Sequence, residues 1–442
     1  MNDLKKTILP LCLILTTIAC HGQSSKRWTL DECISYAWNN NLQVKQQEIV
    51  HEQDINNLKQ SKLSYIPNFS ASMGQNFNWG RSVNIQELQI IENKLSMATS
   101  ASISASTPLI DGLSKYYTVK SNTIQAEISE LNIEKLKNDI SLNITRAYLQ
   151  LLLSKQVYDN AMLSYENIVA QKEQTARLVE AGNRPYSALL EIEAQVASEK
   201  VQVVNAVGNV ETNTLALSQM LDLPYDETFD IVSPNIDSLM SGYNALTVSD
   251  LYSTAKTLPQ IKSAEYALDN SQVQLSMAKG ARYPSISLSA GYGTFYSDAA
   301  EGAFKEQFID NRNPSIGISL NIPIFNGYQA GTKVKNARLN VKNYEIELST
   351  RHQELLKEIR SAITEANNCY ERTIAAEQNM RAMDESFRMA MRKFESGAIT
   401  STDYITSKTN YLKAQSEYYQ AKFQYIFQIK ILDYYKGIPI KL

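Results

Sequence analysis

The sequence repeats one pattern of residues, and this duplication limits the possible folds more than any other feature. Matching residues near the N-terminus, such as Pro67 and Pro284, share an offset of 217 in the numbering, and three later motifs return at an offset of 215. The motifs are Pro-x-x-Asp/Asn-Gly at 108–112 and 323–327, Arg-x-x-Glu-x-Gly ending at Gly182 and Gly397, and Leu/Ile-Pro at 223–224 and 438–439. Solenoid repeats are far shorter, at about 20–50 residues. We therefore predict one body made of two similar halves, residues 23–225 and 247–442, joined by a linker at 226–246.

The overall charge and hydropathy exclude some classes of protein. The 442 residues carry a net charge of −3, so a basic nucleic-acid-binding surface is not expected. Mean hydropathy is −0.30. After residue 19 no apolar run approaches the roughly 20 residues of a membrane-spanning helix. Any contact with a membrane must therefore use something other than a helix bundle.

Residues 1–22 are predicted to be a signal peptide for export. Lys5 and Lys6 precede an apolar stretch from Thr7 to Ala19, which is the usual order of a secretory signal. Two processing routes fit the residues that follow. Cleavage after Gly22 would remove Cys20, whereas the loose lipobox at 17–20 would make Cys20 a lipidated N-terminus. Both routes take the protein out of the cytoplasm.

Within each half the residues indicate a helix, two strands, a very long helix, a tight turn and a returning helix. The first helix should run from Trp28 to about Tyr65, where Pro67 stops it. Apolar and small polar residues alternate at 97–106, 286–292 and 315–324, which is typical of strands with one apolar and one wet face. Strands of about 10 to 13 residues suit a tilted membrane crossing, although a soluble sandwich alternates similarly. The polar segments 78–96 and 298–313 are interpreted as irregular external loops.

The long helices are predicted where Gly and Pro are absent, from 113 to 181 and from 332 to 396. Helices of this length would reach roughly 100 Å. Each carries a narrow apolar stripe, so each should be stable only beside other helices. The stripes include Ile140, Ile144, Leu151, Leu355, Ile359 and Ala366.

An open sheet of four strands would leave the backbone N–H and C=O groups of its two edge strands without hydrogen-bond partners in lipid. Each unpaired backbone group there costs several kcal/mol, so the sheet must close with further copies of itself. Two copies would give eight strands and a filled barrel, whereas three would give twelve strands and leave room for a pore.

With these features the chain resembles the TolC-type outer-membrane efflux proteins over 28–439. The resemblance rests on the opening residues 28–37, the two Pro-x-x-Asp/Asn-Gly motifs and the glycine at each long-helix end. It implies a mainly α fold with a β-barrel portion: a homotrimer whose 12-stranded transmembrane barrel continues into a 12-helix periplasmic α-barrel. It also implies a place in the outer membrane of a Gram-negative bacterium, and partners in a periplasmic adaptor and an inner-membrane pump.

The resemblance also identifies candidate residues at the periplasmic tip. The turns at Gly182 and Gly397 match the adaptor-docking turns, and Asp403 matches an acidic ring that constricts the pore. Thr406 stands where a second acidic residue is expected. A solvated helix residue is the alternative interpretation of Asp403. Four charged residues at the helix ends are further candidates, as dipole-stabilising charges or as partners in a helix-locking hydrogen bond: Arg177, Glu180, Arg392 and Glu395.

Neither a catalytic nor a metal motif is present in the sequence, and no cofactor is expected. Cys33 and Cys369 occupy non-equivalent places in the two halves, as small buried residues or as a disulfide. The leading hypothesis is a passive conduit for efflux or secretion. The alternative is a structural or adhesive trimeric stalk in the outer membrane without transport.

Overall fold

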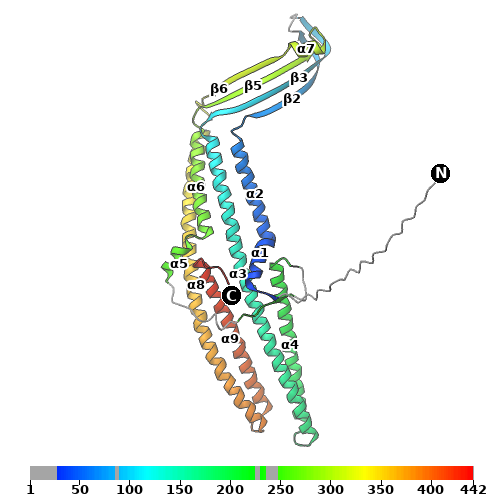
Figure 1. Ribbon diagram of the computed structural model, residues 1–442, viewed down its shortest axis with the longest axis vertical. Helices are drawn as coiled ribbons and strands as arrows, with labels where there is room; N and C mark the ends of the chain where they lie inside the picture. The colour runs from blue at the N-terminus through cyan, green and yellow to red at the C-terminus, as the bar shows by residue number, and fades with distance from the viewer. Residues whose placement is uncertain (1–26, 85–88, 224–228, 235–246, 442) are drawn as a thin grey trace, which may run out of the picture.

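The computed structural model describes residues 27–84, 89–223, 229–234 and 247–441, and shows an elongated molecule with a sheet at one end (Figure 1). Long helices run from the sheet to two separate turns at the opposite end. Of the helices that the structure describes, none combines the length and the apolar character that a membrane crossing requires.

The two halves have the same helices at the predicted spacing. The long helices α3 (Ser114–Glu180) and α8 (Gln329–Glu395) have 67 residues each, and both bounds of α8 keep the offset of 215 from those of α3. The returning helices α4 (Tyr186–Met220) and α9 (Ser401–Tyr435) have 35 residues each and keep the same offset. Helices α2 (Leu42–Leu63) and α6 (Pro259–Gly280) have 22 residues each and keep the offset of 217.

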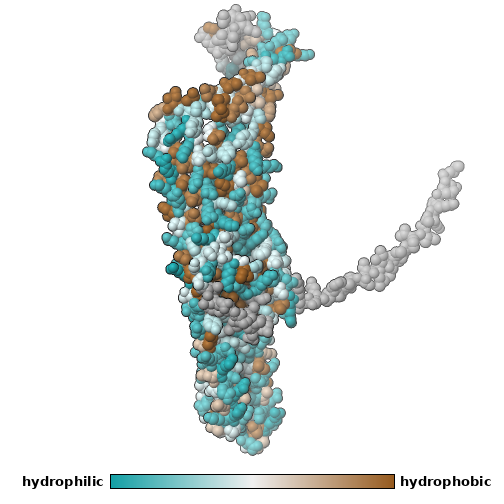
Figure 2. Space-filling model, turned by 60° about the vertical axis from the view of Figure 1, so that its left-hand side comes forward, coloured by the Kyte–Doolittle hydropathy of each residue, from teal (hydrophilic) through white to brown (hydrophobic). Residues whose placement is uncertain are grey.

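The sheet is antiparallel, in the order β2-β3-β5-β6. Its strands are β2 (Asn68–Asn84), β3 (Gln89–Asp111), β5 (Ser285–Ser297) and β6 (Asn313–Asn321). One face carries mainly Ser, Gly and Asn, whereas the opposite face carries large apolar side chains that no described part of the chain covers. Among the latter, Met73 is 75% and Ile316 82% exposed. Figure 2 shows hydrophobic side chains gathered near the strands and a mostly hydrophilic surface on the lower helices.

The prediction of an irregular loop at 78–96 was wrong. Strand β2 continues to Asn84 and β3 begins at Gln89, and the ladder includes Asn78 with Ser96 and Gly80 with Lys94. Backbone pairing across the hairpin therefore overrides the polar composition, which had hidden the strands. The segment 298–313 contains the short helix α7 (Phe304–Asp310) rather than only irregular chain.

The first predicted helix is also interrupted. Helix α1 (Leu30–Asn40) ends at Asn41, whose side chain accepts a hydrogen bond from the Gln43 N–H and so caps the next helix, α2. The equivalent break in the second half lies between α5 (Val248–Ala255) and α6, where Pro259 occupies the first helical turn.

Shorter helices lie along each long one, which agrees with the expectation that the long helices are stable only beside other helices. Helix α3 contacts α2 in its upper part and α4 in its lower part, and α8 similarly contacts α6 and α9 (Figure 1). Residues of the predicted stripes are buried in two core clusters, the first around Ile144 and Leu151 and the second around Leu355 and Ile359. Cys33 and Cys369 are both buried and form no disulfide, which contradicts the disulfide alternative.

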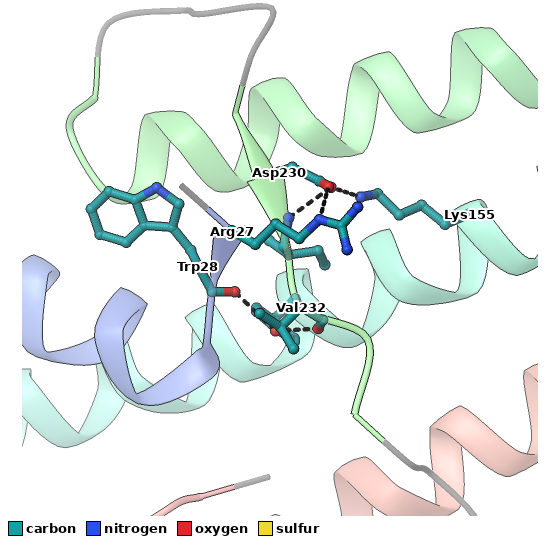
Figure 3. A network of polar contacts seen from close by, with 7 residues as sticks. Arg27, Trp28, Lys155, Asp230 and Val232 are labelled. Carbon is teal, nitrogen blue, oxygen red and sulfur yellow. Dashed lines mark hydrogen bonds and ion pairs between the residues drawn. The ribbon is translucent and has the colours of Figure 1, made fainter. Parts of the chain in front are cut away.

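Two short strands that were not predicted form a clasp halfway down the helices. Strand β1 (Arg27–Trp28) pairs in parallel with β4 (Asp230–Ile231), and Asp230 forms ion pairs with Arg27 and with Lys155 of α3 (Figure 3). Burial alone would raise the pKa of Asp230, but the hydrogen bond and charge of Lys155, with Arg27, hold the pKa below its usual value. The Tyr148 hydroxyl lies 2.6 Å from the Val232 carbonyl oxygen and 3.1 Å from that of Trp28. The clasp therefore fixes the start of the first half against the middle of α3.

Candidate functional site

The two tip turns have the same backbone geometry, because a glycine in the left-handed conformation ends each long helix. Gly182 has φ +72° and Gly397 has φ +76°. In each turn two N–H groups donate back to carbonyl oxygens of the last helical turn, as in a Schellman motif. The outer bonds run from the Asn183 N–H to Leu178 and from the Ala398 N–H to Lys393. A Cβ at either glycine would meet no atom within 4 Å. The turns therefore need glycine for its backbone conformation and leave free space around it.

Asp403 lies in the first turn of α9 and has a structural partner. Its carboxylate accepts hydrogen bonds from the Thr400 hydroxyl at 2.8 Å and the Thr400 N–H at 3.3 Å, and its own N–H donates to Thr400 Oγ1 at 3.2 Å. This reciprocal capping box starts α9. The Thr406 hydroxyl donates to the Thr402 carbonyl oxygen, one turn earlier. Both residues are exposed in the single chain, so the capping role of Asp403 leaves its carboxylate accessible to solvent.

The other predicted tip residues are exposed and do not lock the helices within one chain. Among the described residues, none of the four makes a side-chain hydrogen bond or ion pair: Arg177, Glu180, Arg392 and Glu395. The contact between the two hairpins comes instead from Arg184, just after the first turn. Its guanidinium lies 5.2 Å from the ring centroid of Phe394 and its Nη2 lies 3.5 Å from the Phe394 carbonyl oxygen.

A buried ion pair joins the same two hairpins further from the tip. Lys408 Nζ of α9 lies 3.0 Å from Glu199 Oε1 of α4, and the two side chains are only 8% and 7% exposed. The Ser164 hydroxyl of α3 donates to the other carboxylate oxygen at 3.0 Å, and the Gln195 amide donates to Oε1 at 3.0 Å. The sequence contained a signal for this site, because Glu199 stands between the buried Ile192 and Ala206 at seven-residue spacing, where an apolar residue is expected.

A cleft of about 400 Å³ lies beside this ion pair, between α3 and the hairpin of α8 and α9. Aromatic rings from the second hairpin line one side: Phe387 stacks on Tyr411, and Phe394 stacks on Tyr404. Burial, with the charges of Glu199 and Glu395, raises the pKa of Tyr404. Tyr404 therefore stays neutral at physiological pH and packs α9 against α8 within the second hairpin.

The polar face of the sheet is smooth because its side chains are small. Hydroxyl pairs cross from β2 to β3, with Ser70 and Ser104 at 2.8 Å and Ser72 and Ser102 also at 2.8 Å. Gly291 and Gly317 lie on the same face, and a Cβ there would approach the serine hydroxyls opposite at 3.2 and 3.3 Å. This face can line water without filling the space in front of it. In the part of the chain that the structure describes, no cluster of His, Cys, Asp and Glu could hold a metal ion.

Comparison with known proteins assigns the chain to a family. The model of the "Outer membrane efflux protein" family matches residues 33–222 and 251–428, which is most of both halves. The chain is 23% identical to the outer membrane protein TolC of Escherichia coli over 310 residues, 67% of this chain but only 62% of TolC. It is 19% identical to the alkaline protease secretion protein AprF of Pseudomonas aeruginosa, over 76% of this chain and 69% of AprF.

Solved structures show the same fold over nearly the full length. A crystal structure of CusC, described as forming a transmembrane channel, superposes with a TM-score of 0.78 at 16% identity, covering 93% of this chain and 92% of CusC. Because the family model matches both halves and the fold extends across them, the chain belongs to the outer membrane efflux protein family.

Proposed function

We propose that the protein is the outer-membrane channel of an export system, and that it forms a passive conduit for efflux or secretion. The observation that carries this proposal is the pair of faces on the sheet. Large apolar side chains such as Ile316 are uncovered on one face, while Ser, Gly and Asn occupy the other. A sheet of this kind is stable with lipid on its apolar side and water on its polar side.

Three copies are proposed to build the channel. A single chain supplies a sheet of four strands with two free edges. Closing three such sheets gives twelve strands, which leaves an open lumen, whereas eight strands would be filled by side chains. The helices would continue the ring below the membrane, because each strand pair leads into helices of matching length.

A periplasmic adaptor and an inner-membrane pump are the proposed partners. The names of relatives point to this class of system, since AprF is an alkaline protease secretion protein and CusC belongs to a cation efflux system. The turns at Gly182 and Gly397 are the proposed docking points, because they are exposed, free of neighbouring atoms and of one geometry. The exposed Asp403 carboxylates of three copies would form the pore constriction, with Thr406 one turn further along α9.

Conductance in planar lipid bilayers tests the channel. We expect the purified trimer to give small conductance steps, and Lys408→Met, which removes the buried ion pair between the hairpins, to give larger steps. A stalk without transport would give no steps in either protein, even though the trimer inserts. That result would overturn the channel and favour the structural alternative.

A further inference from the structure

The edges of the sheet define the surface through which copies of this chain join. Strand β2 is paired only with β3, and β6 only with β5, so each has one free edge within the described residues. The ladder between β3 and β5 joins the first half to the second. If the copies form a ring, β6 pairs with β2 of the next copy, and this ladder between copies is equivalent to the β3–β5 ladder within the chain.

The repeat spacings fix the register of this second ladder. The spacings reproduce a register that is observed within the chain. When 217 is added to residue numbers in β2 and 215 to those in β3, the pair Asn68–Ser106 becomes Ser285–Asn321, which is an observed pair between β5 and β6. The observed pair Ser106–Ser289 gives the pair between copies: adding 215 to the first number gives Asn321, and subtracting 217 from the second gives the partner subunit's Ser72. Every other pair between β3 and β5 converts in the same way.

The end of β6 shows that a neighbour is missing there. Strand β3 continues beyond Ser106 to Asp111, and its last residues pair with the start of β5. Among the described residues, no strand lies beside the equivalent residues after Asn321, and β6 stops. Exposure rises at the same positions, because Leu109 and Ile110 are 55% and 54% exposed whereas their equivalents Ile324 and Phe325 are 93% and 86% exposed.

The upper part of α8 also has a face that a neighbouring helix would cover. In its upper part α3 lies between α2 and α6, whereas α6 is the one described helix with extensive contacts to α8 there. Ile124 and Leu131 of α3 are half-buried. Their equivalents on α8, Leu339 and Ile346, are 62% and 66% exposed. Helix α2 is the equivalent of α6, so α2 of the next copy is the helix that would cover this face.

We infer that copies join through β6 and α8 of one chain and β2 and α2 of the next, in the register of Asn321 with the partner subunit's Ser72. This inference rests on the ring assembly proposed above and adds its residue-level contacts. It also identifies one position at which the junction between copies must differ from the junction within a chain.

That position is the transition from sheet to helix. Within the chain Gly112 and Gly280 touch, and a Cβ on either would lie 2.2 Å from the other's carbonyl oxygen. Their equivalents in the second ladder are Gly327 and Leu63. Since Leu63 carries a side chain, the backbones cannot approach as closely, and the junction between copies is wider there. The ring therefore alternates three tight and three wider junctions at the base of the strands.

Cysteine pairs test the register. Asn321→Cys with Ser72→Cys should form a disulfide between chains on oxidation and give a covalent trimer in denaturing gels. The matched control is Ser106→Cys with Ser289→Cys, which occupies the equivalent pair and should close within one chain. The slipped pair, Asn321→Cys with Gly74→Cys, keeps both side chains on the polar face and should give little cross-linking.

The results separate the register from the assembly. Cross-linking of the slipped pair alone, or of neither pair when the control closes and native mass spectrometry shows a trimer, overturns the register but not the trimer. A protein that stays monomeric in detergent overturns the proposed assembly itself.

Matched glycine variants test the wider junction. Gly112→Ala and Gly327→Ala carry the same backbone strain, since φ is +65° and +61°. Only the first adds a clash, because nothing lies within 4 Å of a Cβ at Gly327 in the chain. We expect Gly112→Ala to lower the temperature at which the trimer dissociates, and Gly327→Ala to lower it clearly less. Equal losses would show that the two junctions are equally tight and would overturn this part.

Discussion

Lys408 of α9 and Glu199 of α4 form an ion pair of 3.0 Å with less than a tenth of either side chain exposed, and this pair joins hairpins that otherwise meet only sparsely near the tip. Both carboxylate oxygens of Glu199 are occupied, since Ser164 donates to one and Gln195 and Lys408 share the other. The desolvated charges are therefore satisfied only while the two hairpins stay together.

Removing Lys408 should loosen the lower helices strongly. Lys408→Met leaves the Glu199 carboxylate buried without its counter-charge, which typically costs about 3–5 kcal/mol. We expect faster amide hydrogen exchange in the lower parts of α4 and α9. The control is Lys172→Met, which breaks the exposed pair of Lys172 and Glu193 at the same 3.0 Å distance and should cost at most about 1 kcal/mol. Equal exchange in the two variants would contradict the role of burial.

The tip glycines should be needed for export more than for assembly. Gly182→Val or Gly397→Val forces a β-branched residue into a left-handed conformation, at a cost of about 1–2 kcal/mol per site. The turns should then rearrange while the trimer still forms, and export by cells that carry the cognate pump should fail. Gly208→Ala, within α4 and free of neighbouring atoms, is the control and should export normally. Normal export by both turn variants would exclude a docking role.

Two variants separate the charge of Asp403 from its capping role. Asp403→Asn keeps an oxygen that can accept from Thr400 but removes the negative charge, so the cation preference of the channel should fall. Thr400→Ala removes the cap, at a cost of about 0.5–2 kcal/mol, and should leave ion preference unchanged. Reversal potentials under a salt gradient measure this difference. An unchanged reversal potential in Asp403→Asn would place the carboxylate outside the constriction.

Gly280→Ala should be destabilising although alanine is the better helix former. Propensity alone favours alanine by about 1 kcal/mol inside a helix. The added Cβ, however, would lie 2.2 Å from the Gly112 carbonyl oxygen, which belongs to the backbone and cannot rotate away. Thermal dissociation of the trimer should occur at a lower temperature than in the unmodified protein. A rise in that temperature would show that the two backbones separate without loss.

The clasp between β1 and β4 should weaken in acid. The pKa of Asp230 in the folded protein lies below its ordinary value, so its stabilising effect is complete above the unfolded pKa, about 4, and is lost as the pH falls through the lower folded value. Protease cleavage near Arg27 should therefore increase at pH 3 relative to pH 6. Asp230→Asn should cleave readily at both values. A variant that is protected at pH 6 would show that the ion pairs do not hold the clasp.

Most of the fold could be predicted from the repeat, because equivalent residues end helices or are buried at the same places in both halves. The glycines at 182 and 397 end helices of identical length, and the stripe around Ile144 and Ile359 is buried as expected. The break at Asn41 was missed because asparagine is a weak stop signal on its own. Pro259 directly follows the matching break in the second half, so alignment of the halves would have located it.

The contacts that hold the tip together were harder to predict, because they occur where the halves differ. Arg184 is equivalent to Ile399, and Glu199 is equivalent to Ala414, so neither contact has a repeat partner. Each depends on a residue of the other hairpin that is more than 200 positions away. A pattern read along one strand or helix does not contain that information. The short strands β1 and β4 were missed for the same reason, since two residues give no periodicity.

The clasp also sets a limit on how the N-terminal end can be attached. Trp28 is bound beside Tyr148, about 34 residues into α3 and so roughly 50 Å from the start of the strands. Cys20 lies outside the described residues, but the chain from Cys20 to Arg27 can span at most about 25 Å when fully stretched. While the clasp is closed, a lipid-modified Cys20 would thus stay at least about 25 Å from the start of the strands, measured along α3.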